Sequence, residues 1–303
     1  MKKEEPLANH ARLGPVHLRV IDLPAAMSVW SDVVGLSILA NGGGIAELGV
    51  GGKTLIVLHA GATTVLPPMS RDLFHVAVHV TTRKELARVA ARLRSSGLKH
   101  AAQDHLISES LYVSDPSGNG IEICFDTAER LAATEETAGG VSFVAGDGTR
   151  HTGLEPLNVD LLLRELDQAG AAQTPLASDS FIGHIHLRAR SPERLMDFYV
   201  GLLGFKPHIQ SATFGLFDCG TEERPHMVAF NIWARDALTE PPAGAAGLER
   251  FTVTLPDQSD LAFGARRVGE AAVLSEGDRA LDLTDPEGNR LRIVREGRTS
   301  ETN

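Results

Sequence analysis

The sequence predicts an α+β protein built from four βαβββ modules that form two similar halves. An internal repeat is the first observation: "GPVHLRV" at 14–20 returns as "GHIHLRA" at 183–189, and "DPSGNGIEI" at 115–123 returns as "DPEGNRLRI" at 285–293. The second is that the order strand, helix and three short strands occurs twice within each half. A fixed repeat spacing indicates duplicated structural units. We therefore predict homologous halves at 14–126 and 182–296.

The first module begins with an alternating strand at 16–20. Pro24 then opens a helix that Gly35 closes, because proline suits the first helical turn and glycine suits the residue just after a helix. Met27, Trp30 and Val34 follow helical spacing and predict its buried side. Three strands follow, at 37–41, 44–49 and 54–59.

The second module begins with a strand at 73–80 and continues into a helix. Thr82 with Glu85 three residues later is a capping-box pattern, and Gly97 marks the helix end. The last strand of this module is predicted at 120–125.

The second half repeats this order of elements. Pro192 opens a helix, a further strand starts near Leu248, and the last strand is predicted at 289–295. Between the halves, 127–181 is rich in Ala, Gly, Thr and Glu, and we predict a linker with one short helix at 159–166. Tails are expected at 1–13 and 297–303.

Composition limits the classes of function. The chain has 303 residues, which suggests two domains, with 43% hydrophobic and 22% charged residues and a net charge of -10. This acidic balance argues against binding nucleic acid or an anionic membrane surface, because both need a basic face. The two cysteines imply no disulfide framework, and no signal peptide or apolar span is evident, so a cytoplasmic protein is expected.

Three strand residues are candidate metal ligands. Side chains alternate between the two faces of a strand, so His17, His75 and Glu122 each point away from the aliphatic face of their strand. If helices cover the aliphatic faces, these three residues line a concave surface. Two imidazoles and one carboxylate with open positions are typical of non-haem Fe(II) oxygenases.

The second half serves as an internal comparison for this set. His17 aligns with His186, but His75 aligns with Phe251, Glu122 with Arg292, Tyr112 with Asp282 and His105 with Ser275. An arginine in place of the glutamate would repel a metal ion. The comparison therefore predicts that the metal site lies in the first half.

A motif around Glu122 points to a known family. Its fixed elements are His105, a short spacer, Leu111-Tyr112, the Asp-Pro-Ser-Gly of 115–118, and Glu122. This stretch resembles the signature of type I extradiol dioxygenases, with Gln103 standing where that signature has a small residue. The fourfold module plan resembles the vicinal oxygen chelate superfamily of glyoxalases, extradiol dioxygenases and bleomycin-resistance proteins. The resemblance covers nearly all of both halves and is strongest to bacterial two-domain catechol-2,3-dioxygenase-like proteins.

The resemblance implies two glyoxalase-like domains with curved mixed sheets and helices on the outer faces. It also implies that His17, His75 and Glu122 bind Fe(II) or Mn(II). Tyr112 matches a tyrosine that hydrogen-bonds an oxygen at the metal site, and His105 matches a histidine that contacts the substrate hydroxyl or bound oxygen. The implied activity is ring cleavage of a small catechol-like aromatic by O₂.

One family feature lacks a match at its expected place. The usual acid–base histidine has no counterpart within "GVGGKTLIVLHA" at 49–60. His59 and His79 lie on plausible strand faces but not at that position. His226 occupies roughly that position in the second half, where no complete metal set is predicted.

Two alternatives remain open from the sequence. The first is a glyoxalase-type isomerase, lyase or thiol transferase, which would draw a fourth metal ligand from the strand at 54–59, where Val57 stands. The second is a protein that binds a small aromatic ligand without turnover. The oligomeric state is also open, with a homo-oligomer among the alternatives.

Overall fold

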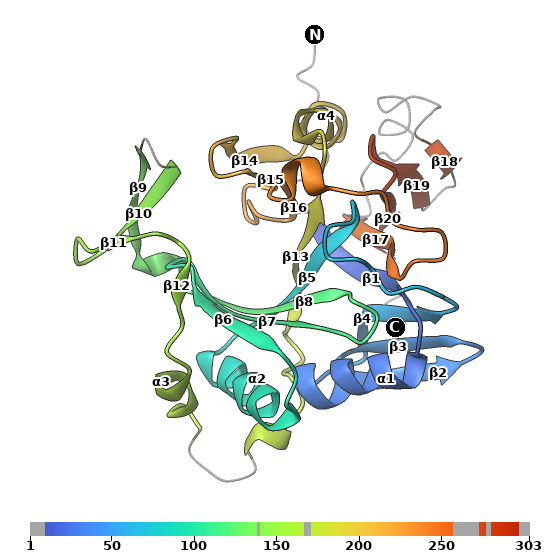
Figure 1. Cartoon of the computed structure of the whole chain (residues 1–303), viewed down its shortest axis with the longest axis horizontal. Helices are drawn as coiled ribbons and strands as arrows, with labels where there is room; N and C mark the ends of the chain where they lie inside the picture. Colours follow the sequence, from blue (N-terminus) through green and yellow to red (C-terminus); the bar gives the residue numbers. More distant parts are fainter. Residues whose placement is uncertain (1–9, 138–139, 167–170, 257–272, 277–279, 297–303) are drawn as a thin grey trace, which may run out of the picture.

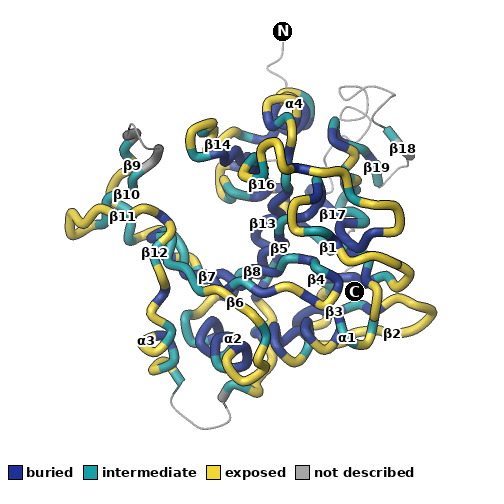
Figure 2. Tube along the Cα trace, viewed as in Figure 1, coloured by how far each residue is buried: buried dark blue, intermediate teal, exposed yellow. Residues whose placement is uncertain are grey.

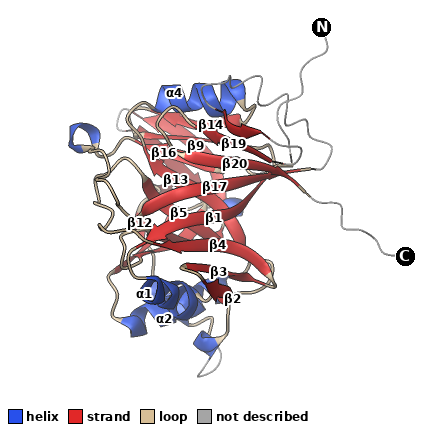
Figure 3. Ribbon diagram, turned by 90° about the vertical axis from the view of Figure 1, so that its right-hand side faces the viewer, coloured by secondary structure: helices blue, strands red, loops and turns tan. Residues whose placement is uncertain are grey.

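A computed structural model describes residues 10–137, 140–166, 171–256, 273–276 and 280–296. Most of the expected N-terminal tail and all of the expected C-terminal tail lie outside the described residues. The described chain forms two large curved mixed sheets and one small sheet, with helices at the periphery (Figures 1 and 3). No described helix is long and apolar enough to span a membrane.

The first large sheet joins the two ends of the chain. Its eight strands run in the order β18 (Val273–Glu276), β19 (Ala280–Thr284), β20 (Arg290–Arg295), β17 (Gly247–Leu255), β1 (Arg12–Val20), β4 (Lys53–Ala60), β3 (Ile45–Val50) and β2 (Ser37–Gly42).

The second large sheet is formed from the middle of the chain. Its nine strands run in the order β12 (Glu155–Pro156), β6 (His100–Asp104), β7 (Ser108–Ser114), β8 (Gly120–Asp126), β5 (Leu73–Val80), β13 (Phe181–Arg188), β16 (Val228–Asn231), β15 (Leu216–Gly220) and β14 (Lys206–Ser211).

The modules therefore pair differently from the predicted halves. The first module pairs with the fourth through the antiparallel contact of β1 with β17, and the second pairs with the third through β5 and β13. The predicted domains at 14–126 and 182–296 are corrected accordingly, since each sheet draws on both. The repeat identifies the modules, but all four open with a similar strand, so the sequence does not say which of these strands pair.

The local signals in the first module place its elements correctly. Asp22 caps α1 (Leu23–Ser28), which has a proline in its first turn, and the helix continues as a π-helical segment, Val29–Val34. Gly35 ends this segment with a φ of 98°, in the left-handed region that glycine favours. Trp30, which is fully buried, anchors the element in the core.

The helix of the second module packs against the first module. Thr82 caps α2 (Arg83–Ser96) by accepting a hydrogen bond from the Glu85 amide, as the capping box predicts. The buried Arg92 guanidinium donates to the carbonyls of Val33 and Val34, which end the π-helical segment. These bonds satisfy carbonyls that the helix end leaves unpaired and so join the two modules on one side of the molecule.

The segment between the halves carries more structure than the predicted linker. It contains the short helix α3 (Val159–Leu163), close to the expected 159–166, followed by the 3₁₀ turn Ala171–Gln173. It also forms a three-stranded sheet of β9 (Leu131–Thr137), β10 (Gly140–Ala145) and β11 (Arg150–His151). This sheet extends away from the buried central strands β5 and β13 (Figure 2).

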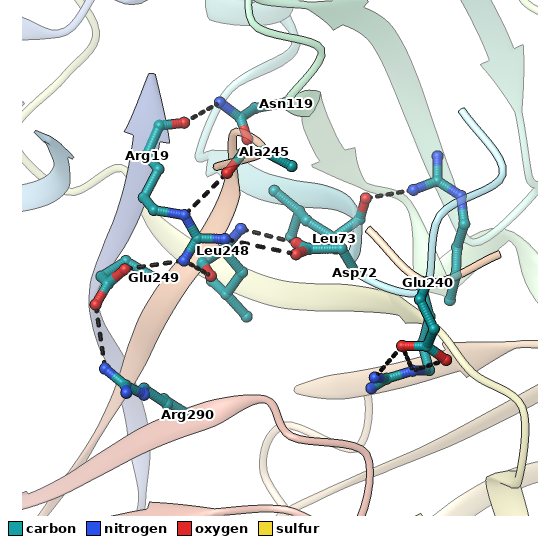
Figure 4. A network of polar contacts seen from close by, with 11 residues as sticks. Arg19, Asp72, Leu73, Asn119, Glu240, Ala245, Leu248, Glu249 and Arg290 are labelled. Carbon is teal, nitrogen blue, oxygen red and sulfur yellow. Dashed lines mark hydrogen bonds and ion pairs between the residues drawn. The ribbon is translucent and has the colours of Figure 1, made fainter. Parts of the chain in front are cut away.

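A polar network joins the two large sheets where β1, β5 and β17 approach one another (Figure 4). The buried Asp72 carboxylate accepts hydrogen bonds from the amides of Leu73, at 2.6 Å, and Leu248, at 2.8 Å. Arg19 donates to the carbonyl of Leu248 and forms an ion pair with Glu249. The network thus satisfies polar groups buried between strands that are far apart in sequence.

Four further helical segments lie outside these sheets. The third module contains α4 (Pro192–Met196), which opens at the predicted proline and continues as a π-helical segment, Asp197–Leu202. Single 3₁₀ turns span Ala128–Arg130 and Arg235–Ala237.

Candidate metal centre

Three potential ligand atoms converge on the inner face of the nine-stranded sheet. The Glu122 Oε2 atom lies 2.9 Å from His75 Nε2 and 3.0 Å from His184 Nε2, and the two Nε2 atoms are 3.0 Å apart. All three side chains are buried. His75 and Glu122 come from the second module on β5 and β8, whereas His184 comes from the third module on β13.

A turn before β8 determines on which face of the strand Glu122 lies. The Asp115 carboxylate accepts hydrogen bonds from the amides of Ser117 and Asn119, and Gly118 adopts a φ of 88°. At Gly120 a Cβ atom would lie 1.9 Å from the Phe74 carbonyl oxygen, so only glycine allows β8 to approach β5 this closely. Alternation from Gly120 then directs Ile121 and Ile123 to the core and Glu122 to the inner face.

A β-bulge brings His184 to the same face. On β13, Ile182 pairs with Val78 and His184 pairs with Ala77, so Gly183 is an extra residue. The bulge allows Ile182 to join the core while His184 turns to the face that carries His75. Bulges commonly redirect a side chain next to an active site.

The convergence fits a divalent metal ion better than a hydrogen-bonded cluster. Each imidazole N–H can point at only one neighbour, so hydrogen bonds cannot satisfy all three contacts of the triangle. Ligand atoms about 2.1 Å from a metal and at right angles to one another stand about 3.0 Å apart, which matches the three separations. Two imidazoles and one carboxylate also suit a mid-row metal.

The electrostatics favour the protonation states that metal binding needs. Burial raises the pKa of the Glu122 carboxyl, but the His75 and His184 rings outweigh burial and hold that pKa well below its ordinary value. Burial, followed by the nearby His226, lowers the pKa of His184 to about 3. An ionised carboxylate and a neutral imidazole are the forms that coordinate metals.

The predicted pair Tyr112 and His105 adjoins this centre. The Tyr112 hydroxyl donates to Glu122 Oε1 at 2.8 Å, and His105 Nε2 lies 2.8 Å from the same hydroxyl oxygen. The Gly153 carbonyl, from the segment between the halves, accepts a hydrogen bond from His105 Nδ1. Burial and the Glu122 charge raise the pKa of Tyr112, so its hydroxyl stays protonated and can donate.

His226 lies beside the centre, because the third module pairs with the second. Its ring centroid is 4.3 Å from that of His184, and its Nδ1 atom bonds the buried Asp218 carboxylate on β15. Burial raises the pKa of Asp218, but hydrogen bonds from His208 and His226 hold it at about 2. The sequence places His226 in a half for which no complete metal set is predicted, and the pairing of the second and third modules brings it beside the candidate centre.

Two other histidines surround the cluster without joining the triangle. The Asn231 amide donates to His186 Nε2 at 3.0 Å, which occupies a nitrogen that could otherwise bind a metal. His79 lies on the far side of His184, with its Nε2 atom 3.4 Å from His184 Nδ1 and its Nδ1 atom 3.1 Å from Asp126 Oδ2.

The predicted ligand His17 lies in the other large sheet, so the predicted set is corrected. Its Nδ1 atom is 2.9 Å from His59 Nε2, and the Arg250 guanidinium donates to its Nε2 atom at 3.1 Å. The strand registers place Arg250, not Phe251, at the position that His75 holds in the nine-stranded sheet.

The inner face beside His17 suits no cation. A cavity of about 350 Å³ there is lined by three arginines and two acidic residues among others, and Arg292 forms a bidentate pair with Asp282. Burial and the Arg250 charge lower the pKa of His17 to about 4.

The candidate ligand His184, which the sequence analysis does not predict, has a signal in the sequence. In "GHIHLRA" two histidines two residues apart share a strand face, and the repeat aligns only His186 with His17. His184 aligns with Pro15, so the comparison of halves concealed it. The bulge at Gly183 was not evident from the sequence.

Comparisons with known proteins agree with this fold. Residues 12–123 match the Glyoxalase/Bleomycin resistance protein/Dioxygenase superfamily model. The chain is 32% identical over 279 residues to catechol-2,3-dioxygenase of Bacillus subtilis (strain 168), covering 90% of this chain and 93% of that protein. The chain belongs to the glyoxalase/bleomycin resistance/dioxygenase superfamily.

Further similarities are more distant. Glutathione transferase FosA of Serratia marcescens is 28% identical over 125 residues, which are 41% of this chain and 88% of that protein. Glyoxalase I of Zea mays has a TM-score of 0.58 at 16% sequence identity, covering 94% of this chain and 92% of that one. This structural likeness confirms the predicted fold of paired βαβββ modules.

Proposed function

We propose that the protein is a metal-dependent extradiol dioxygenase that cleaves the ring of a small catechol-like aromatic with O₂. The convergence of His75, Glu122 and His184 beside Tyr112 and His226 supports this activity most directly. The similarity to a catechol-2,3-dioxygenase over 90% of the chain also supports it.

We propose His75, Glu122 and His184 as the metal ligands, with Fe(II) as the first choice of metal and Mn(II) as the second. A divalent ion bound by these three residues would supply open positions for a catechol and O₂, would acidify a bound hydroxyl and would allow electron transfer between the two. Among the described residues, the group of possible ligands at this centre consists of these three residues. Three ligands fit this role better than a glyoxalase-type site with a fourth protein ligand.

The proton steps fall to the neighbouring residues. His226, close to His184 and held by Asp218, is placed to accept a proton from a catechol hydroxyl. The ionised Asp218 then stabilises the resulting imidazolium and fixes the ring orientation. Asp218 itself is fully buried, whereas His226 is partly exposed.

Tyr112 and His105 act on the opposite side of the carboxylate. The Tyr112 hydroxyl holds Glu122 Oε1, which leaves Oε2 directed at the two imidazoles. His105 Nε2 contacts the Tyr112 hydroxyl and His105 Nδ1 donates to the Gly153 carbonyl, so His105 in turn holds Tyr112 against the carboxylate.

Metal analysis and oxygen uptake test this proposal. The protein is purified, reconstituted anaerobically with Fe(II) or Mn(II), and exposed to O₂ with a panel of catechols. We expect one metal per chain, oxygen uptake and a coloured ring-cleavage product. The variants H75A, E122A and H184A should lose the metal, whereas H17A should keep it.

Two results would contradict the proposal. A wild-type protein that holds no metal after anaerobic reconstitution would rule out the metal centre. Turnover of a carbonyl or epoxide substrate without oxygen uptake would instead favour the glyoxalase-type or thiol-transferase alternative, and ligand binding without turnover would favour the binding-protein alternative.

A further inference from the structure

His79 lies outside the proposed ligand set, and each of its two ring nitrogens has a polar partner. His79 is placed between His184 and Asp126, with contacts of 3.4 Å from its Nε2 atom and 3.1 Å from its Nδ1 atom. The side chain is largely buried, with 13% exposed. None of the proposed catalytic steps uses this residue.

Metal binding at His184 fixes the direction of these hydrogen bonds. If His184 binds a metal through Nε2, its proton resides on Nδ1 and points at His79 Nε2, which must accept it. His79 then carries its own proton on Nδ1 and donates it to Asp126 Oδ2.

The backbone leaves room for His79 at one residue. A Cβ atom at Gly183 would lie 1.9 Å from His79 Cδ2 and 2.2 Å from its Nε2 atom. The same glycine is the extra residue of the bulge that directs His184 to the centre. Gly183 therefore both directs His184 to the centre and leaves room for the His79 ring.

We propose that His79 and Asp126 are positioning residues that orient the His184 ring and increase its basicity toward the metal. The inference rests on the proposed ligand role of His184, but not on any catalytic step. Carboxylates and carbonyls commonly accept the second N–H of a metal-bound histidine, and loss of such a partner weakens metal binding by about 10–100-fold. Here a second imidazole is interposed between the ligand and the carboxylate.

A rival use of the same residues is a separate metal site. His79, Cys124 and Asp126 offer three ligand atoms within 4.8 Å of one another. In the proposed arrangement His79 has no free lone pair, because Nε2 accepts from His184 and Nδ1 donates to Asp126. The proposal therefore requires one metal per chain and no dependence on Cys124.

The test measures affinity for Co(II) and Zn(II) by competition with a chelator, without any substrate. H79L should weaken both affinities about 10–100-fold and alter the visible spectrum of bound Co(II). H79Q should restore part of the affinity, since its amide can both accept from His184 and donate to Asp126. D126N should show a smaller loss than H79L.

Two control variants complete the design. C124A should leave affinity and a stoichiometry of one unchanged, and H100L, at an exposed position on β6, should match the wild type. Thermal unfolding of each variant, in the presence of chelator, separates loss of the His184–His79–Asp126 hydrogen bonds from loss of folding.

Equal affinities for H79L and wild type would overturn the proposal. So would a wild-type stoichiometry of two that falls to one in C124A. The chain could instead bind metal, with the expected loss of affinity in H79L, but turn over no catechol. The proposed activity would then fail, while the positioning role of His79 and Asp126 would stand.

Discussion

Glu122 Oε2 lies 3.0 Å from His184 Nε2, although one residue belongs to the second module and the other to the third. The candidate centre is therefore formed only where β8, β5 and β13 lie side by side in one sheet. A strand from each half of the repeat is required, which has direct consequences for mutation and for folding.

His226 should be required for turnover but not for metal binding. We expect H226Q to lower kcat about 10²–10⁴-fold, since general acid–base residues contribute on this scale, while the metal content stays at the wild-type level. H100Q, at an exposed histidine on β6, is the matched control. A kcat for H226Q equal to that of the wild type would exclude His226 as the proton acceptor.

Gly183 should tolerate no side chain. In G183A the new methyl group would overlap the His79 ring, so we expect a loss of about 1–3 kcal/mol in the free energy of unfolding together with weaker metal binding. G201A is the control, because a Cβ atom there meets nothing within 4 Å. Urea unfolding and chelator competition measure the two effects, and an unchanged G183A would show that the bulge readily shifts.

Asp72 should stabilise the junction of the two large sheets. D72A leaves the buried amides of Leu73 and Leu248 without their acceptor, and we expect the free energy of unfolding to fall by about 2–4 kcal/mol. D147A removes an exposed carboxylate and should change stability little. Urea unfolding at one pH compares the free energies of unfolding of D72A and D147A. Equal losses of stability would count against a special role for the junction.

His17 should make the protein less stable in mild acid. Its pKa is about 4 in the folded chain because of burial and Arg250, whereas the unfolded chain binds this proton near pH 6.5. Between these values the unfolded state holds more protons, so the contribution of neutral His17 is complete above pH 6.5 and declines as the pH falls toward 4. Unfolding of wild type and H17Q at pH 7, 5.5 and 4.5 should show the wild type losing more stability, and parallel curves would contradict the assignment.

Much of the local structure could be predicted from the sequence. Thr82 caps its helix and Gly35 ends its helical segment, because capping depends on a few neighbouring residues. The strand at 73–80 coincides with β5, since alternation of Val76, Val78 and Val80 is a local signal. The superfamily followed from the motif around Glu122 for the same reason.

The candidate centre could be predicted only in part. His75 and Glu122 converge as expected, because both belong to one module whose strands β5 and β8 are neighbours. The sequence predicts His17 where the structure places His184, since the choice depends on which modules pair, and that is decided by long-range packing. The bulge at Gly183 added a second obstacle, because one extra residue reverses the face on which a side chain lies.

The pairing of the chain's ends with each other, and of its middle with itself, also bears on synthesis. When the first two modules leave the ribosome, β1 and β5 each lack the antiparallel neighbour that will cover one edge, and such open edges invite association with other chains. β5 gains its partner once β13 has been made, but β1 must wait for β17, which is made later still. The centre can thus form while the other sheet is still open, and closure of that sheet is the late step in which a growing chain most needs a chaperone.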